Sequence, residues 1–92
     1  MDLEQLRREI DYIDAQLVIL LEKRMDLINQ VAAYKKREQI EVLNQKRETT
    51  ILETVSKSIQ NADYEKTILA TFESIMAYSR LYQCQRLTHD KD

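Results

Sequence analysis

Apolar residues recur at alternating spacings of three and four along the first third of the chain, which is the pattern of one helix face. The series consists of Leu3, Leu6, Ile10, Ile13, Leu17, Leu20, Arg24, Leu27, Val31 and Tyr34, so an arginine takes one apolar position. This pattern predicts one helix over residues 3–38, with Asp2 as its N-cap. Such a helix would be roughly 54 Å long, whereas a compact domain of this size has a radius of gyration of about 13 Å. We therefore expect a second copy of the chain to cover part of the apolar face.

Two shorter helices are predicted in the rest of the chain. One spans residues 45–58 or 45–60 with Asn44 as its N-cap, and the next follows a turn in which Asp63 is the N-cap. Their apolar faces consist of Ile51, Leu52, Val55 and Ile59 in the second helix, and of Ile68, Leu69, Phe72, Ile75 and Met76 in the third. The chain has no glycine and no proline, which favours few long helices joined by loops without a positive φ angle.

Two segments lie outside this periodic pattern. Ile40, Val42 and Leu43 are expected to fold the first connection back onto the core, and the residues from Arg86 onward form a polar tail. The sequence therefore predicts an all-α fold of three helices, one of them very long, in a single domain over residues 1–92.

Composition favours a globular protein with no strong bias toward nucleic acid or membrane. Hydrophobic residues make up 43% and charged residues 33% of the chain, and the formal net charge is −2. No run of 18 apolar residues is present, and residues 1–4 lack the basic and apolar segments of a signal peptide. The single cysteine, Cys84, excludes an internal disulfide. We therefore expect a cytoplasmic protein.

Several polar side chains interrupt or border the predicted inward faces. Arg24 and Lys35 are eleven residues apart, which places them within about 20° on one helix face and roughly 16 Å apart along the axis. Glu48, Ser79 and Gln83 lie on the inward faces of the second and third helices. Arginine and lysine suit carboxylates, whereas Glu48 and Gln83 suit hydroxyl or ether groups. Together these residues favour a pocket for a small anion that carries several charges.

Each of these residues also has a purely structural explanation. Arg24 could set the register of a coiled coil, and Lys35 could extend toward solvent at the helix end. Glu48 could pair with a neighbouring basic residue, and the polar positions of the third helix could mark where it leaves the core. The functional interpretation depends on all three helices losing apolar character on the inward side.

Arg7 flanks the apolar series and lies 17 residues before Arg24. Along one helix that separation is about 25 Å, with the side chains about 100° apart, so the two arginines cannot hold one small molecule within one chain. If two first helices pack antiparallel, Arg7 of one chain approaches the middle of the other. The alternative is that Arg7 and Arg8 form a solvated basic pair near a helix start.

The order and spacing of these residues resemble the all-helical (AroQ-class) chorismate mutases. The matching residues lie at 6–14, 20–24 and 31–35 and continue with Arg47, Glu48, Ser79 and Gln83, so the resemblance covers about residues 3–85. It implies an intertwined helical homodimer with two active sites, each built by both chains. It also implies a free-standing, monofunctional isomerase that rearranges chorismate to prephenate in phenylalanine and tyrosine biosynthesis.

The resemblance assigns the substrate's two carboxylates to separate groups of residues. Arg24 and Ser79 would bind one carboxylate, and Arg7 of the partner subunit would bind the other with help from Lys35. Asn44 stands where many members have an aspartate, and a modest effect is expected from this departure.

The resemblance also assigns catalytic roles. Lys35 and Gln83 would donate hydrogen bonds to the enol-ether oxygen, and Glu48 would accept one from the ring hydroxyl. Arg47 would support the site less directly. Arg80 is a second departure, because an apolar wall residue would be possible there. The rearrangement requires no cofactor and no metal ion.

Two alternatives to a mutase remain open. An isochorismate-pyruvate lyase has the same fold and much of the same site, although Glu48 favours the mutase because it suits the chorismate hydroxyl. A non-catalytic helical dimerisation module would have no pocket, and an acid such as Asp14 or Glu22 would neutralise Arg24.

Overall fold

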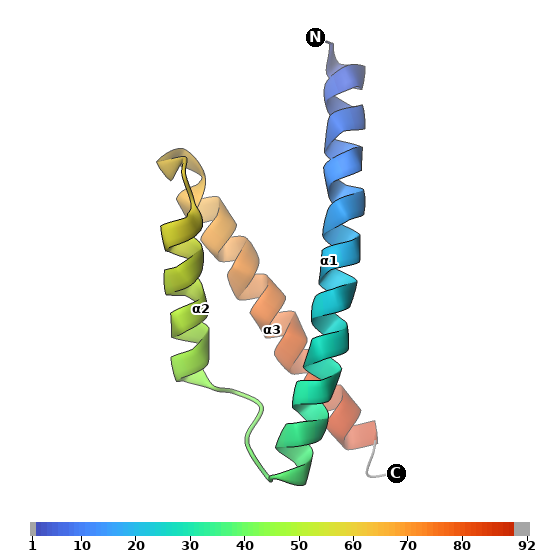
Figure 1. The fold of residues 1–92 in the computed structure, drawn as a ribbon, viewed down its shortest axis with the longest axis vertical. Helices are drawn as coiled ribbons and strands as arrows, with labels where there is room; N and C mark the ends of the chain where they lie inside the picture. Colours follow the sequence, from blue (N-terminus) through green and yellow to red (C-terminus); the bar gives the residue numbers. More distant parts are fainter. Residues whose placement is uncertain (1, 90–92) are drawn as a thin grey trace.

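Three α-helices make up most of the part of the chain that the structure describes (Figure 1). The computed structural model describes the backbone of residues 2–89 and the side chains of residues 2–86. Helix α1 spans Leu3–Arg37, α2 spans Gln45–Ser58, and α3 spans Glu65–His89 after a short 3-10 turn, η1, at Ala62–Tyr64. α3 packs against both α1 and α2, while the N-terminal half of α1 extends beyond the other helices. The prediction of an all-α fold with three helices, one of them long, is confirmed.

The two ends of α1 are closed in different ways. At the start, the Asp2 carboxylate accepts a hydrogen bond of 2.8 Å from the Gln5 backbone N–H, as an N-cap does. At the end, the Ile40 N–H donates to the Lys35 carbonyl at 2.8 Å and the Gln39 N–H donates to the Lys36 carbonyl at 3.3 Å. These are the two bonds of a Schellman motif, which places Gln39 in the left-handed region at a φ of 57°. The expectation of loops without a positive φ is therefore wrong, because this helix ending requires one even where no glycine is present.

The connection between α1 and α2 differs in part from the prediction. Val42 is partly buried, but Ile40 and Leu43 are about half exposed, so these two residues do not fold onto the core. The connection ends at Asn44, whose side-chain oxygen accepts a hydrogen bond of 3.0 Å from the Arg47 N–H. The predicted N-cap of α2 is thus confirmed.

The connection between α2 and α3 has a different cap from the predicted one. Asn61 accepts a hydrogen bond of 2.9 Å from the Asp63 N–H and so begins the 3-10 turn. Asp63 lies within that turn and α3 begins at Glu65, so the prediction of Asp63 as the cap of α3 is wrong. The Glu65 carboxylate accepts a hydrogen bond of 2.5 Å from the Ser56 hydroxyl, which fixes the start of α3 against α2.

The far end of α3 also differs from the prediction. The helix continues to His89, beyond the predicted start of a polar tail at Arg86. The rest of the predicted tail, residues 90–92, lies outside the described residues.

Few apolar side chains are buried within the single chain. In the described part, Ala32 and Met76 are the buried apolar residues, whereas Leu17 in the middle of α1 is 49% exposed. The radius of gyration is 16.5 Å, larger than the value of about 13 Å for a compact chain of about 100 residues. Over its N-terminal half, α1 therefore has an apolar face that the rest of the described chain does not cover. No helix within residues 2–89 is long and apolar enough to cross a membrane.

The strained end of α1 leads to a prediction about stability. A left-handed conformation is unfavourable for a residue with a Cβ atom, whereas glycine adopts it freely. We expect Gln39→Gly to raise the free energy of unfolding by about 0.5–1 kcal/mol, after allowing for the larger entropy of glycine in the unfolded chain. Urea denaturation at one fixed protein concentration measures this change. Gln39→Ala is the matched control and should give no gain, because alanine keeps the Cβ atom.

The N-cap of α2 leads to a second prediction. Asn44→Ala removes the oxygen that accepts from the Arg47 N–H, so the free energy of unfolding should fall by about 1 kcal/mol. Asn44→Asp keeps an acceptor and adds a negative charge at the positive end of the helix dipole, so it should be at least as stable as the natural protein. Thermal and urea unfolding of the two variants measure the difference. Equal loss in both variants would contradict the capping role.

Candidate active site

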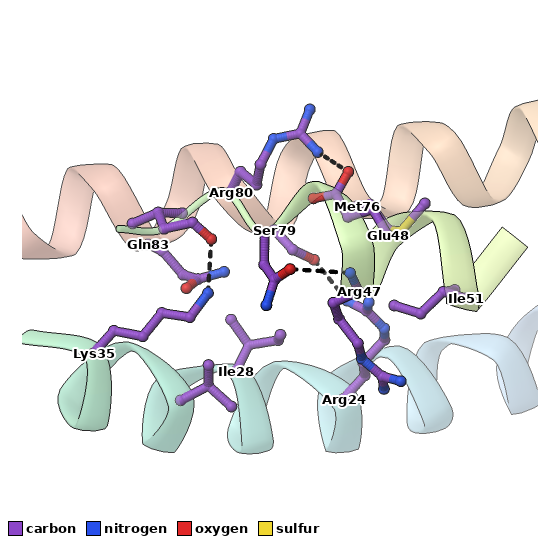
Figure 2. Close-up of a pocket in the computed structure, with 13 residues that line it drawn as sticks. Arg24, Ile28, Lys35, Arg47, Glu48, Ile51, Met76, Ser79, Arg80 and Gln83 are labelled. Atoms are coloured by element: carbon purple, nitrogen blue, oxygen red, sulfur yellow. Dashed lines mark hydrogen bonds and ion pairs between the residues drawn. The ribbon is translucent and has the colours of Figure 1, made fainter. Parts of the chain in front are cut away.

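A cavity of about 170 Å³ opens between the C-terminal half of α1, the start of α2 and the C-terminal half of α3 (Figure 2). Its lining residues are Arg24, Ile28, Val31 and Lys35 from α1, Val42 and Asn44 from the connection, Arg47, Glu48 and Ile51 from α2, and Met76, Ser79, Arg80 and Gln83 from α3. The four residues from α1 recur at three- and four-residue spacings, so one face of the helix supplies them all. The cavity therefore lies where the polar positions of the three helices meet.

Most of the predicted site residues come together in this cavity. Those that line it are Arg24, Lys35, Asn44, Arg47, Glu48, Ser79 and Gln83. Arg7 does not line it, because this residue is exposed in the second turn of α1, in the half that extends away from the other helices. Arg7 and Arg24 of one chain are therefore far apart along α1, as predicted from their spacing in the sequence.

Arg24 is held by a hydroxyl group rather than by a carboxylate. Its Nη1 atom donates a hydrogen bond of 2.7 Å to Ser79 Oγ, and this hydroxyl in turn donates to the Ile75 carbonyl at 2.8 Å. Ser79 is only 5% exposed, so the bond between α1 and α3 is shielded from water. Among the side chains of residues 2–86, no carboxylate forms an ion pair with Arg24. Its positive charge is therefore oriented by the protein and left without a protein anion.

Lys35 is oriented by the connection between α1 and α2. Its ammonium group donates a hydrogen bond of 2.7 Å to the Val42 carbonyl. An ammonium group has three donors, so two remain for a ligand in the cavity. Because Lys35 and Arg24 lie on the same face of α1, the two cations face the cavity from two positions along its length.

Gln83 supplies a buried amide from α3. The side chain is 4% exposed, and its oxygen is buried without a hydrogen-bond partner in the described structure. A buried polar atom without a partner is costly, so such an atom in a cavity indicates a group that a ligand or water satisfies. Gln83 lies one turn after Ser79, so both polar groups project from one face of α3.

Glu48 is paired with a cation that the site prediction did not include. Its carboxylate forms an ion pair with the Arg80 guanidinium, which joins the first turn of α2 to α3 (Figure 2). With Arg24, Lys35 and Arg47, four positive charges and one negative charge line the cavity. The chain as a whole has a formal net charge of −2, so the positive charge is local to this site.

The apolar walls of the cavity are not among the site residues predicted from the sequence. Ile28 follows Arg24 by one turn, Ile51 follows Glu48 by three residues, and Met76 precedes Ser79 by three. Residues three or four positions away from a predicted polar residue lie on the same helix face, so this spacing could have identified the three wall residues. Val42 had no such signal, because the loop conformation alone brings it to the cavity.

The cavity combines oriented cations, two amides and one carboxylate with apolar walls. Two separated cations can hold a small molecule with two carboxylates in one conformation, and fixed donors can stabilise negative charge that develops on it. In the described part of the chain, no three side chains of the His, Cys, Asp and Glu types are grouped as metal ligands are.

Comparison with known proteins identifies the family. The family model described as chorismate mutase type II matches residues 6–84, which covers most of the chain and all the residues that line the cavity. A search of individually curated proteins gave no significant match. Because the match extends over all three helices and the cavity between them, the chain belongs to the type II chorismate mutase family.

Proposed function

We propose that the cavity between α1, α2 and α3 is the active site in which this chain rearranges chorismate to prephenate. The observation that supports this most directly is the Arg24 guanidinium, which Ser79 orients and which has no carboxylate partner in the described protein. Chorismate has two carboxylates, a ring hydroxyl and an enol-ether oxygen. The cavity offers cations for the first, the Glu48 carboxylate for the second, and Lys35 and Gln83 for the third.

The reaction is an intramolecular [3,3] rearrangement, so the protein has to restrain a flexible dianion rather than attack it. Arg24 holds one carboxylate, with Ser79 fixing the direction of its guanidinium. When both carboxylates are held, the enolpyruvyl arm stays folded over the ring, close to the geometry in which the new C–C bond forms. The apolar walls from α1, α2 and α3 limit the volume in which the substrate can unfold.

Lys35 and Gln83 act on the bond that breaks. Negative charge builds on the ether oxygen as the C–O bond lengthens, and fixed donors stabilise this charge more in the transition state than in the ground state. Lys35 brings an ammonium group already oriented by the Val42 carbonyl. Gln83 brings a neutral donor from its amide nitrogen, and the Glu48 carboxylate accepts from the ring hydroxyl.

A homodimer completes the proposal, with Arg7 of the partner subunit binding the second carboxylate. The apolar face of α1 supports this, because Leu6, Ile10, Ile13 and Leu17 are all more than 40% exposed in the single chain. A second, largely apolar cavity lies where the end of α2 meets the start of α3, and it offers an uncovered surface for a second copy of α1. The compartment in this proposal is the cytoplasm, supported by the single cysteine.

Chorismate consumption tests the proposed activity. The purified protein should remove the absorbance of chorismate, and acid treatment should convert the product to phenylpyruvate. Lys35→Ala should lower kcat/KM by about 100- to 1,000-fold, because one donor to developing charge contributes about 2.7–4 kcal/mol. Lys36→Ala, one residue further along α1, is the matched control. Release of pyruvate and salicylate from isochorismate, without chorismate turnover, would indicate the lyase instead.

Mixing two inactive variants tests the shared site. If Arg7 acts across the dimer, Arg7→Ala and Lys35→Ala should each be nearly inactive alone and should regain activity after chain exchange. One site of each heterodimer receives both substitutions and the other receives none. Half of a statistical mixture is heterodimer, so about a quarter of the natural activity is the ceiling.

The single variants and the mixture separate the alternatives for Arg7. If Arg7 served its own chain, every heterodimer site would carry one substitution and mixing would restore nothing. If Arg7 were a solvated surface charge, Arg7→Ala would be active on its own. Sedimentation of each variant at micromolar concentration shows whether the dimer is intact, and a well-folded monomer would contradict the proposed assembly.

A further inference from the structure

Arg80 is a cation of the cavity to which the proposed reaction gives no role. It follows Ser79 on α3, and its guanidinium pairs with the Glu48 carboxylate on α2. Both side chains line the cavity, with the Arg80 side chain 33% and the Glu48 side chain 19% exposed. The pair therefore forms part of the cavity wall, and neither partner is a fully solvated surface charge.

The geometry of the pair leaves one carboxylate oxygen for a ligand. The guanidinium engages Glu48 Oε1, and a carboxylate has about four lone-pair sites on its two oxygens. Oε2 can therefore accept a hydrogen bond from a hydroxyl while Oε1 stays with Arg80. A glutamate side chain on its own has several rotamers, and a charge-assisted bond to a planar guanidinium selects among them.

The charge of the pair matters as much as its geometry. The substrate is a dianion, so an unpaired carboxylate in the same small cavity would repel it. Arg80 cancels the charge of Glu48 where Arg24 and Lys35 are left positive. The cavity thus gains a hydrogen-bond acceptor without adding net negative charge.

We propose that Arg80 is a positioning residue that holds Glu48 in place as the acceptor for the substrate's ring hydroxyl. The proposal rests on the chorismate mutase activity proposed above. It makes Arg80 a determinant of specificity for the hydroxyl, although Arg80 itself does not touch the reacting atoms.

The test compares two substrates in two proteins. One substrate is chorismate, and the other is the analogue in which hydrogen replaces the ring hydroxyl. The natural protein should prefer chorismate in kcat/KM. Arg80→Met should lower kcat/KM for chorismate by about tenfold, mainly through KM, because the hydroxyl contact is made equally in the ground state and the transition state. For the analogue the loss should be clearly smaller, so the preference for the hydroxyl falls.

Two further variants control for folding and for charge. Arg80→Lys keeps a cation near Glu48 and should restore part of the hydroxyl preference. Arg86→Met makes the same replacement at an exposed position of α3 that does not line the cavity, and should change neither rate nor preference. Circular dichroism and thermal unfolding show that each variant is folded at the assay temperature.

Each other outcome overturns the inference. If Arg80→Met lowered kcat/KM equally for both substrates, the Arg80–Glu48 pair would have only a structural role. A gain in kcat/KM for chorismate would mean that Arg80 competes with the substrate for Glu48. If the natural protein leaves chorismate unchanged, the proposed function fails and this inference fails with it, whereas an unchanged Arg80→Met in an active protein removes this inference alone.

Discussion

The hydrogen bond between Arg24 and Ser79 is the interaction on which the site depends. It joins α1 to α3 at the cavity, and it directs a positive charge that no carboxylate of the described chain neutralises. A protein acid at this point would have formed a stronger hydrogen bond with the guanidinium, since hydrogen bonds between two ionised groups are stronger than those to a neutral hydroxyl. The neutral serine instead orients the cation and leaves most of its attraction for a ligand. The same serine proton is donated to the Ile75 carbonyl, so the hydroxyl presents its acceptor side to Arg24.

The single chain also buries little of its own apolar surface. A long amphipathic helix gains its stability from whatever covers its apolar face, at about 25 cal/mol per Å² of buried apolar area. In α1 most of that face is exposed, and Ala32 is its one buried residue in the described part of the chain. The helix that supplies Arg24 and Lys35 is thus held within the chain mainly by α3. Assembly and site formation are therefore linked in the proposed dimer, because the surface that needs a partner and the surface that needs a substrate belong to one helix.

Much of this arrangement could be predicted from the sequence, for identifiable reasons. The spacing of apolar residues was enough to predict the three helices. The positions of Arg24, Lys35, Ser79 and Gln83 within that spacing predicted that they lie on inward faces, because the geometry of an α-helix is nearly invariant. The spacing of apolar residues could not predict features that depend on the path of a loop. The left-handed Gln39 and the 3-10 turn before Glu65 follow from local hydrogen bonds that compete with helix continuation. The exposure of Ile40 and Leu43 follows from the path of the connection between α1 and α2. The Arg80–Glu48 pair was equally hidden, because it joins two helices whose relative placement the spacing within either helix does not determine.

At the end of α1, Lys35 forms two hydrogen bonds with the loop that follows. The backbone carbonyl of Lys35 accepts from the Ile40 N–H, and its side-chain ammonium donates to the Val42 carbonyl. Surface loops commonly tolerate added or deleted residues because their path is independent of the elements they connect. Here the direction of the Lys35 side chain depends on the path of the loop, because the loop supplies the carbonyl that accepts its hydrogen bond. The length of this connection is therefore constrained by the position of the Val42 carbonyl as well as by the distance that it spans, because an inserted residue would shift the acceptor that orients the ammonium group.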